Sequence, residues 1–251
     1  MVFTDFLNPV FAPLLGLDPL LAVGIVALVV SVLITVIYKY TTDQDLMKRL
    51  KTELKELQAE MKLLRDNPEK MMEVNKKAME SNMKYMSQSM KSTLYTLLPL
   101  FLIFGWMNAN FSYESIQPGE QFSATLMFAK NTVGNATIAL PPGIEAVGPM
   151  TQTIADAKAT FQLKGQEGAY TEGKALTFDY NNKLYYKEVL ITDGFAYAPK
   201  DEKISDSKLK LITLDYDKRR ILPVLGWGWL GAYILFSIVF SMLIRKWMNV
   251  Y

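Results

Sequence analysis

Three long stretches without a charged side chain constrain this chain more than any other feature. They run over Pro19–Tyr38, Ser92–Tyr113 and Ile221–Ile244. At 1.5 Å per residue, a helix of about 20 apolar residues crosses a hydrocarbon core of about 30 Å. A buried core helix is the alternative for any one stretch. Three stretches in one chain of 251 residues instead favour an integral membrane protein with three transmembrane helices.

Basic residues near the ends of these stretches predict their orientation. Lys39, Lys48 and Arg49 closely follow the first stretch, whereas no Lys or Arg precedes it. Lys84 and Lys91 precede the second stretch. Because short loops rich in Lys and Arg stay in the cytoplasm, we predict a multi-pass plasma-membrane protein with its N-terminus outside and its C-terminus cytoplasmic.

The residues before the first stretch lack the basic flank of a cleaved signal peptide, so we expect the first span to remain as an anchor. Their apolar side chains suggest a segment lying at the outer interface. The predicted domains are an outer interfacial segment (1–17), span one (18–40), a cytoplasmic hairpin (41–91), span two (92–110), an extracellular domain (111–220), span three (221–245) and a cytoplasmic tail (246–251).

The absence of two residue types narrows the functional classes. The chain has no His and no Cys, which excludes Ser-His-Asp and Cys-His catalysis, disulfides and the usual zinc sites. No span carries the Asp pair or Ser-Lys arrangement of an intramembrane hydrolase. Gly168–Ala175 resembles a phosphate loop, but Ala175 replaces the Mg²⁺-binding hydroxyl. We therefore expect no enzymatic activity, no metal and no cofactor.

The predicted cytoplasmic segment has the periodicity of two antiparallel helices. Apolar residues at spacings of three and four form the a/d pattern of a coiled coil in its first half: Met47, Leu50, Leu54, Leu57, Met61 and Leu64. Pro68 is well placed to start a return helix. A second predicted seam follows on that helix: Met72, Met79, Met83, Met86 and Met90. Together these features predict an antiparallel coiled-coil hairpin.

The methionines of this hairpin have two interpretations. They can simply fill a thin coiled-coil interface. An unbranched thioether also adapts to many apolar partners, and a two-helix hairpin cannot bury all of its apolar positions. The second interpretation predicts a client-contacting face made of Met71, Met72, Met79, Met83, Met86 and Met90.

The long segment between the second and third stretches has the alternation of β-strands. Apolar residues occupy every second position in two places: Phe122, Ala124, Leu126 and Phe128, then Leu176, Phe178 and Tyr180. Asn181-Asn182 suits a two-residue hairpin turn, because Asn tolerates positive φ. We predict an extracellular, sandwich-like all-β domain. Two sequons, at Asn110 and Asn135, are candidate N-glycosylation sites on the predicted outer side.

Polar residues within the spans gather toward the predicted cytoplasmic ends at helical spacing. They are Ser31, Thr35 and Lys39 in the first span, Ser92 and Thr96 in the second, and Ser237, Ser241 and Arg245 in the third. Residues four apart share a helix face. Helix–helix packing is one interpretation, because Ser and Thr can bond to the preceding turn. The other is a hydrophilic groove open to the cytosol.

The hairpin and second span resemble a known family. The carrying residues are Asp66-x-Pro68-Glu69-Lys70-Met71, then Met90-Lys91-x-x-Leu94-Tyr95-Thr96-x-x-Pro99 leading to Phe104-Gly105-Trp106. They are similar to archaeal YidC-like membrane proteins of the YidC/Oxa/Alb insertase superfamily, which are relatives of the insertase subunit of the ER membrane complex. The resemblance implies an insertase or chaperone with a cytosol-facing groove built from the three spans.

Two functional hypotheses follow. In the first, the protein passes client transmembrane segments into the bilayer without nucleotide hydrolysis. Its partners would be nascent membrane proteins, the lipid bilayer, and a ribosome, the signal recognition particle or the Sec translocon. In the second, it is a membrane-anchored adaptor or structural protein whose external β-domain binds a surface partner.

Overall fold

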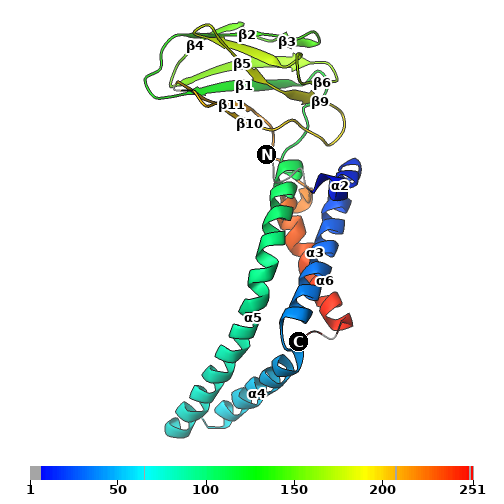
Figure 1. The fold of residues 1–251 in the computed structure, drawn as a ribbon, viewed down its shortest axis with the longest axis vertical. Coiled ribbons are helices and arrows are strands. Elements are labelled where there is room, and N and C mark those ends of the chain that lie inside the picture. The colour runs from blue at the N-terminus through cyan, green and yellow to red at the C-terminus, as the bar shows by residue number, and fades with distance from the viewer. Residues whose placement is uncertain (1–6, 65, 207, 249, 251) are drawn as a thin grey trace. The chain divides into compact units, whose positions relative to one another are not determined.

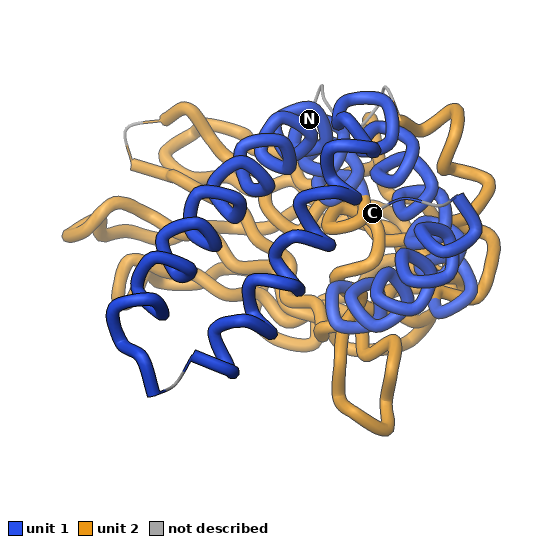
Figure 2. Tube along the Cα trace, turned by 90° about the horizontal axis from the view of Figure 1, so that it is seen from below, with its two compact units in different colours: residues 1–5, 20–106, 230–251 blue, residues 6–19, 107–229 orange. Residues whose placement is uncertain are grey.

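The computed structural model describes residues 7–64, 66–206, 208–248 and 250 (Figure 1). The described chain divides into two compact units (Figure 2). One unit is helical and comprises residues 20–106 and 230–250. The other contains the β-strands and comprises residues 7–19 and 107–229.

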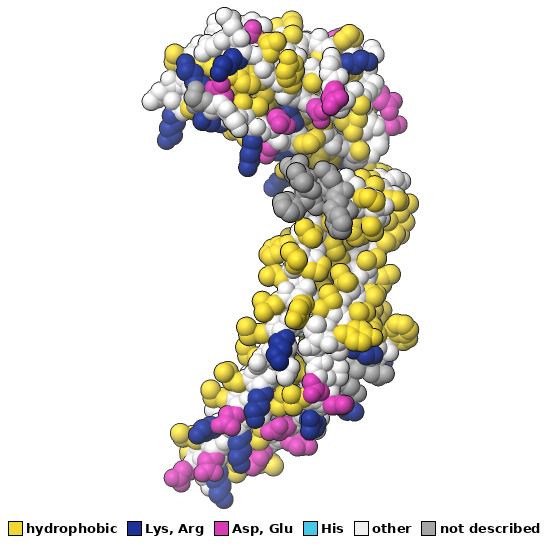
Figure 3. All heavy atoms as spheres, viewed as in Figure 1, with side chains coloured by type: hydrophobic (Ala, Val, Ile, Leu, Met, Phe, Trp, Pro, Cys, Tyr) yellow, Lys and Arg dark blue, Asp and Glu magenta, His cyan; other side chains and the backbone are white. Residues whose placement is uncertain are grey.

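Three helices are long and apolar enough to cross a membrane: α3 (Pro19–Thr41), α5 (Pro68–Phe111) and α6 (Trp229–Trp247). Helix α5 has 44 residues and continues through Pro99, so the predicted return helix and the predicted second span are one helix. Figure 3 shows hydrophobic side chains over the spans and charged side chains over the hairpin. The expected apolar spans are therefore present as helices.

The third span begins later than its uncharged stretch suggested. Ile221 was the expected first residue, but α6 starts at Trp229. Pro223 opens a short 3₁₀ turn, η2 (Pro223–Leu225), and Gly226 then adopts a left-handed φ of 66°. A residue in the left-handed region interrupts a helix, so residues 223–225 form a separate short turn and are not the first turn of α6.

Helix α4 (Gln44–Leu63) and the first part of α5 form the hairpin. Asp43 caps α4 by accepting a hydrogen bond from the Leu46 N–H, 3.0 Å away. In the predicted seam of α4, Met47 and Leu50 are buried, and Leu54, Leu57, Met61 and Leu64 are half-buried. Ser81 of α5 donates to a carboxylate oxygen of Glu53 over 2.8 Å, which links the two helices.

The predicted seam of the return helix is wrong. Met72, Met79, Met83, Met86 and Met90 are all exposed. The packed face instead contains Met71 and, otherwise, smaller or polar side chains, also at spacings of three and four: Val74, Ala78, Ser81, Tyr85, Gln88 and Ser92. Two a/d patterns therefore coexist on α5, and the buried one is not the methionine pattern.

The β-domain consists of antiparallel strands, as expected. The strands are β1 (Gln121–Phe128), β2 (Asn135–Ala139), β3 (Ile144–Ala146), β4 (Thr151–Thr153), β5 (Lys158–Gly165), β6 (Gly168–Tyr170), β7 (Leu176–Tyr180), β8 (Lys183–Lys187), β9 (Val189–Ile191), β10 (Asp201–Lys203) and β11 (Leu209–Leu214). They form sheets of order β10-β11-β1-β5-β3 and β4-β2-β7-β8, with β6-β9 as a separate pair.

Two aromatic contacts show that the two larger sheets pack face to face. Phe161 of β5 lies 5.6 Å from Phe178 of β7, and Phe128 of β1 lies 4.9 Å from Tyr180 of β7, measured between ring centroids. The alternating apolar residues of β1 and β7 are buried, as their pattern predicted. Asn181 and Asn182 form the expected turn, with φ values of 55° and 60°.

A short stem joins the β-domain to the ends of the neighbouring helices. The Glu114 N–H donates to the Asp217 carbonyl, and the Arg219 N–H donates to the Ser112 carbonyl. The Arg219 side chain is buried, and its Nη2 donates to the Phe195 carbonyl over 2.7 Å. Its Nε lies 3.7 Å from Glu114 Oε2. These contacts hold residues 112–114 against residues 217–219, and the two segments together form the stem.

The N-terminal residues form two short elements, α2 (Asn8–Phe11) and η1 (Ala12–Gly16). They belong to the segment predicted to lie at the outer interface. Residues 1–6 of that segment lie outside the described residues.

Candidate functional site: a polar cavity between two spans

A cavity of about 210 Å³ lies between α3 and α6, within the helical unit. Its lining contains Ser31, Ile34, Thr35, Tyr233, Ser237, Ile238, Ser241 and Arg245. Five of the eight residues predicted for the groove therefore meet at one place. They come from two helices that are almost two hundred residues apart in the sequence.

The polar lining follows from helical spacing on each span. Ser31 and Thr35 share one face of α3, and Ser237 and Ser241 share one face of α6. Nearer the amino end of α3, the two helices are in close contact, since a Cβ added at Gly24 would lie 3.7 Å from the Phe236 ring of α6. The apolar contact and the polar cavity thus occupy the same α3–α6 seam.

The hydroxyl groups of the lining donate to their own helices. Thr35 Oγ1 donates to the Ser31 carbonyl over 2.7 Å, and the Ser237 and Ser241 hydroxyls donate to Ile234 and Ile238 over 2.9 and 3.1 Å. This is the local bonding that the packing interpretation expected. In these three residues the hydroxyl proton is used in this way, so toward the cavity each of the three oxygens can act only as an acceptor.

Cationic side chains lie at the ends of α3 and α6. The Arg245 guanidinium carbon lies 5.1 Å from the centroid of the Tyr38 ring, a cation–π distance. Lys39 Nζ donates to the Met248 carbonyl over 3.3 Å. Arg245 lines the cavity, whereas Lys39 does not. The cavity therefore has hydroxyl oxygens along its wall and one guanidinium at its end.

The two predicted groove residues of α5 lie elsewhere. Ser92 is buried at the end of the packed face of α5, and Thr96 is half-buried with its hydroxyl donating to the Thr93 carbonyl over 3.0 Å. Neither lines the cavity. The predicted three-helix groove thus corresponds here to a two-helix cavity.

Tyr233 is a lining residue that the sequence reasoning missed. It lies four residues before Ser237, so extending the polar stripe by one turn would have found it. Its ring makes an edge-to-face contact with Phe104 of α5, at 4.8 Å between centroids. Tyr233 therefore connects the cavity wall to α5, which contains the predicted second span.

The exposed methionines of α5 form a second candidate surface, which we call the Met face: Met72, Met79, Met83, Met86 and Met90. More than half of each side chain is exposed. Met71, the sixth predicted member, is half-buried on the packed side of α5. The Met face contains flexible apolar side chains without the packing that the thin-interface interpretation required.

The β-domain offers a different chemistry. A cavity of about 360 Å³ is lined by four acidic residues, among others: Glu114, Glu120, Asp215 and Asp217. Within the described residues, no three acidic side chains are grouped to hold a metal ion. Of the two sequon residues, Asn135 is exposed at the start of β2, whereas Asn110 is half-buried at the end of α5.

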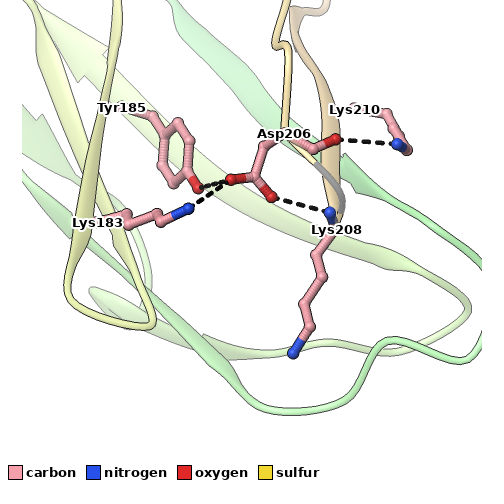
Figure 4. A network of polar contacts seen from close by, with 5 residues as sticks. All are labelled: Lys183, Tyr185, Asp206, Lys208 and Lys210. Carbon is pink, nitrogen blue, oxygen red and sulfur yellow. Dashed lines mark hydrogen bonds and ion pairs between the residues drawn. The ribbon is translucent and has the colours of Figure 1, made fainter.

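A polar cluster ties two edges of this domain together (Figure 4). Asp206, between β10 and β11, accepts hydrogen bonds from Lys183 Nζ, the Tyr185 hydroxyl and the Lys208 N–H at 2.9, 3.2 and 2.8 Å. The Lys208 N–H and the Lys183 ammonium hold the pKa of this carboxyl well below its usual range. These bonds join β8 to the segment between β10 and β11, and we assign the cluster to stability.

Comparison with known proteins gives one finding. Residues 6–144 match the family described as integral membrane protein EMC3/TMCO1-like. The matched region is more than half of the chain and contains α3, the hairpin and α5, whereas α6 and most of the β-domain follow it. No curated protein and no solved structure matches the chain.

Proposed function

Because this chain belongs to the EMC3/TMCO1-like family of integral membrane proteins, within the Oxa1/YidC/Alb3 insertase-related superfamily, we propose that it is an insertase or chaperone for membrane proteins. Membership supports a general role in membrane protein insertion. The proposed mechanism is passage of a client segment along the α3–α6 cavity, without nucleotide hydrolysis. The cavity lining is the observation that carries this mechanism.

The chemistry of the lining suits a polar tail that must cross the inner half of a bilayer. A charged group at the bilayer centre costs roughly 2.5–3.5 kcal/mol on insertion scales. Hydroxyl oxygens at Ser237 and Ser241, which are half-buried, can accept hydrogen bonds from a client backbone, and Arg245 can pair with a client carboxylate. Such contacts lower the cost of desolvating the tail, while the client's own apolar segment supplies the driving force.

The Met face supports the preceding step. A client segment must be kept from aggregating before it partitions into lipid. Exposed, unbranched methionines can fit apolar helices of different shape, as at other promiscuous binding surfaces. We propose that this face holds the segment near the cytoplasmic end of the cavity.

Orientation and partners follow from the same proposal. The N-terminus lies outside and the C-terminus in the cytoplasm, at the plasma membrane, so that the hairpin faces newly made proteins. The clients are nascent membrane proteins delivered by a ribosome, the signal recognition particle or the Sec translocon. The β-domain is then extracellular.

Photocrosslinking tests the mechanism. A photoreactive amino acid at Thr35 or Ser241 is compared with one at Val29 or Val239, which lie on the same helices and are about half exposed. We expect adducts with a newly synthesised single-span client at positions 35 and 241 and at least fivefold fewer at positions 29 and 239. Equal or absent adducts at all four positions would reject the cavity route.

The adaptor hypothesis makes the opposite forecast. It requires probes in the β-domain to capture one defined surface partner while cavity probes capture no client. Placing a probe at Val133, an exposed residue between β1 and β2, in the same experiment distinguishes the two functions.

A further inference from the structure

The uncharged residues that precede α6 form a closed apolar turn, residues 222–227. The Leu222 N–H donates to the Trp227 carbonyl over 3.0 Å, and the Trp227 N–H donates back to the Leu222 carbonyl over 3.2 Å. Inside this pair, the Leu225 and Gly226 N–H groups donate to the Leu222 and Pro223 carbonyls at 3.1 and 3.2 Å. The apolar turn is thus held by its own backbone.

The side chains of the apolar turn are turned outward. Val224 is 96% exposed, the highest value for a large apolar side chain among the described residues. Leu225 and Trp227 are about half exposed. Contiguous exposed apolar side chains mark surfaces that contact a protein or a membrane.

We propose that the apolar turn inserts into the interfacial layer of the bilayer beside the amino end of α6, and that lipid is its partner. Val224 and Leu225 would enter the boundary of the acyl chains. Trp227 would lie at headgroup level, where Trp rings are favoured. This inference concerns anchoring and does not depend on the proposed insertase function.

The length of α6 is the first argument for lipid. Its 19 residues span about 28 Å, slightly less than a hydrocarbon core of about 30 Å. Its last turn also carries Arg245 and Lys246, which favour the headgroup region at the opposite end. The hydrocarbon boundary therefore falls at or before Trp229.

Chain connectivity supplies the second argument. Leu225 is only four residues before Trp229, so even a fully extended connection reaches no further than about 14 Å. The apolar turn must remain within that distance of the boundary, whatever the arrangement of the rest of the β-domain. A lipid partner is always in reach, whereas a protein partner would have to be recruited.

Backbone bonding supplies the third argument. Unsatisfied N–H groups are costly where water is scarce. In the apolar turn, Pro223 has no N–H, and the N–H groups of Leu222, Leu225, Gly226 and Trp227 all have acceptors inside the turn. A loop built in this way can enter the interface without leaving most of its donors unbonded.

The charges next to the turn agree with this placement. Lys218 and Arg220 precede it directly, and both are exposed. Long cationic side chains at the edge of a membrane can reach lipid phosphates while their stems lie along apolar surface. The order of cations, apolar turn and span is the order expected from headgroup to hydrocarbon.

Fluorescence quenching tests the proposal in the full chain, which has no native cysteine. Val224→Cys, labelled with bimane, is reconstituted in phosphatidylcholine vesicles without client or partner. The matched control is Val133→Cys, because Val133 is 80% exposed on the β-domain. Quenching by doxyl-labelled lipid and by aqueous iodide is measured for both variants.

We expect doxyl lipid to quench the probe at position 224 at least threefold more than at position 133, and iodide to quench it at least threefold less. Leu225→Cys should behave like Val224→Cys, which guards against a local effect of one substitution. Iodide quenching at position 224 equal to that at position 133 would overturn the proposal. So would a photoprobe at position 224 that captures a protein and no lipid in native membranes.

Discussion

Arg245 lies over the ring of Tyr38, with 5.1 Å between its guanidinium carbon and the ring centroid. This contact connects the last turn of α6 with the end of α3 and orients the only cation in the lining of the described α3–α6 cavity. An exposed cation–π pair of this kind contributes about 0.5–1 kcal/mol. The position of the charge is therefore defined by an aromatic neighbour.

Arg245→Gln should reduce insertion of clients with an acidic tail by up to about fivefold, the factor that corresponds to about 0.2–1 kcal/mol for an exposed ion pair between the guanidinium and a client carboxylate. Clients with a neutral tail should change less, because they have no carboxylate to pair with the guanidinium. Insertion into proteoliposomes, scored by protease protection of the tail, measures the effect. Lys246→Gln is the control, since Lys246 is the adjacent charge but does not line the cavity. Equal losses in both variants would contradict a specific role for Arg245.

Thr35→Val should reduce client insertion by about two- to tenfold. The change removes one hydroxyl group from the cavity wall, whose hydrogen bonding contributes about 0.5–1.5 kcal/mol, and keeps the side-chain volume. Thr41→Val is the matched control. Thr41 Oγ1 makes the same bond to its own helix, at 2.7 Å to the Ile37 carbonyl, but lies outside the cavity lining. The same protease-protection assay distinguishes the two. Equal losses in both variants would assign the effect to the lost bond within the helix and not to the cavity.

Replacing Met79, Met83 and Met86 together by Ser should lower client crosslinking to the hairpin while leaving its thermal stability within about 0.5 kcal/mol, because all three side chains are exposed. Met47→Ser should instead lower the stability of the hairpin. Met47 is fully buried, and loss of a buried Met side chain costs about 2–5 kcal/mol. Resistance to limited proteolysis reports stability, and crosslink yield reports binding. Unchanged crosslinking in the triple variant would assign these methionines no role in client contact.

Asp206→Asn should weaken the β-domain and change its response to acid. Hydrogen bonds depress the pKa of Asp206 in the folded chain, so its stabilising effect is present above the ordinary value of 3.8 and is lost as the pH falls below it. Thermal melting of the full chain between pH 7 and pH 2 should show a smaller acid-induced drop in the variant.

Glu145→Gln is the comparison, since its ion pair with Lys164, at 3.2 Å, is exposed on both sides and should contribute little. An acid response of Asp206→Asn identical to that of the unmodified chain would show that the cluster in Figure 4 does not stabilise the fold.

Much of this architecture was predictable because the signals are local. Charge-free stretches of sufficient length predict spans, as for α3. Period-two alternation predicts strands, as for β1 and β7. Asn181-Asn182 predicts the two-residue turn that joins β7 to β8. These patterns depend on residues close in sequence, so they could be interpreted without knowing the fold.

Local signals failed where two patterns competed on one element. Helix α5 carries a methionine seam and a seam of Val74, Ala78 and Ser81, and only packing against α4 decides which is buried. Hydrophobicity favoured the methionines, but side-chain size favoured the smaller residues. Ser92 and Thr96 lie outside the lining of the α3–α6 cavity for a related reason, because the direction in which each residue of α5 faces depends on its neighbours.

The sequence by itself determined that this protein is a membrane-spanning chain with a charged helical hairpin and an antiparallel β-domain, because charge, length and periodicity are properties of short segments. The tertiary structure decided that Ser31 and Thr35 meet Ser241 and Arg245 around one cavity, and that the Met face is free. Contacts between α3 and α6 join residues far apart in the chain, and no local pattern specifies which helix faces will meet.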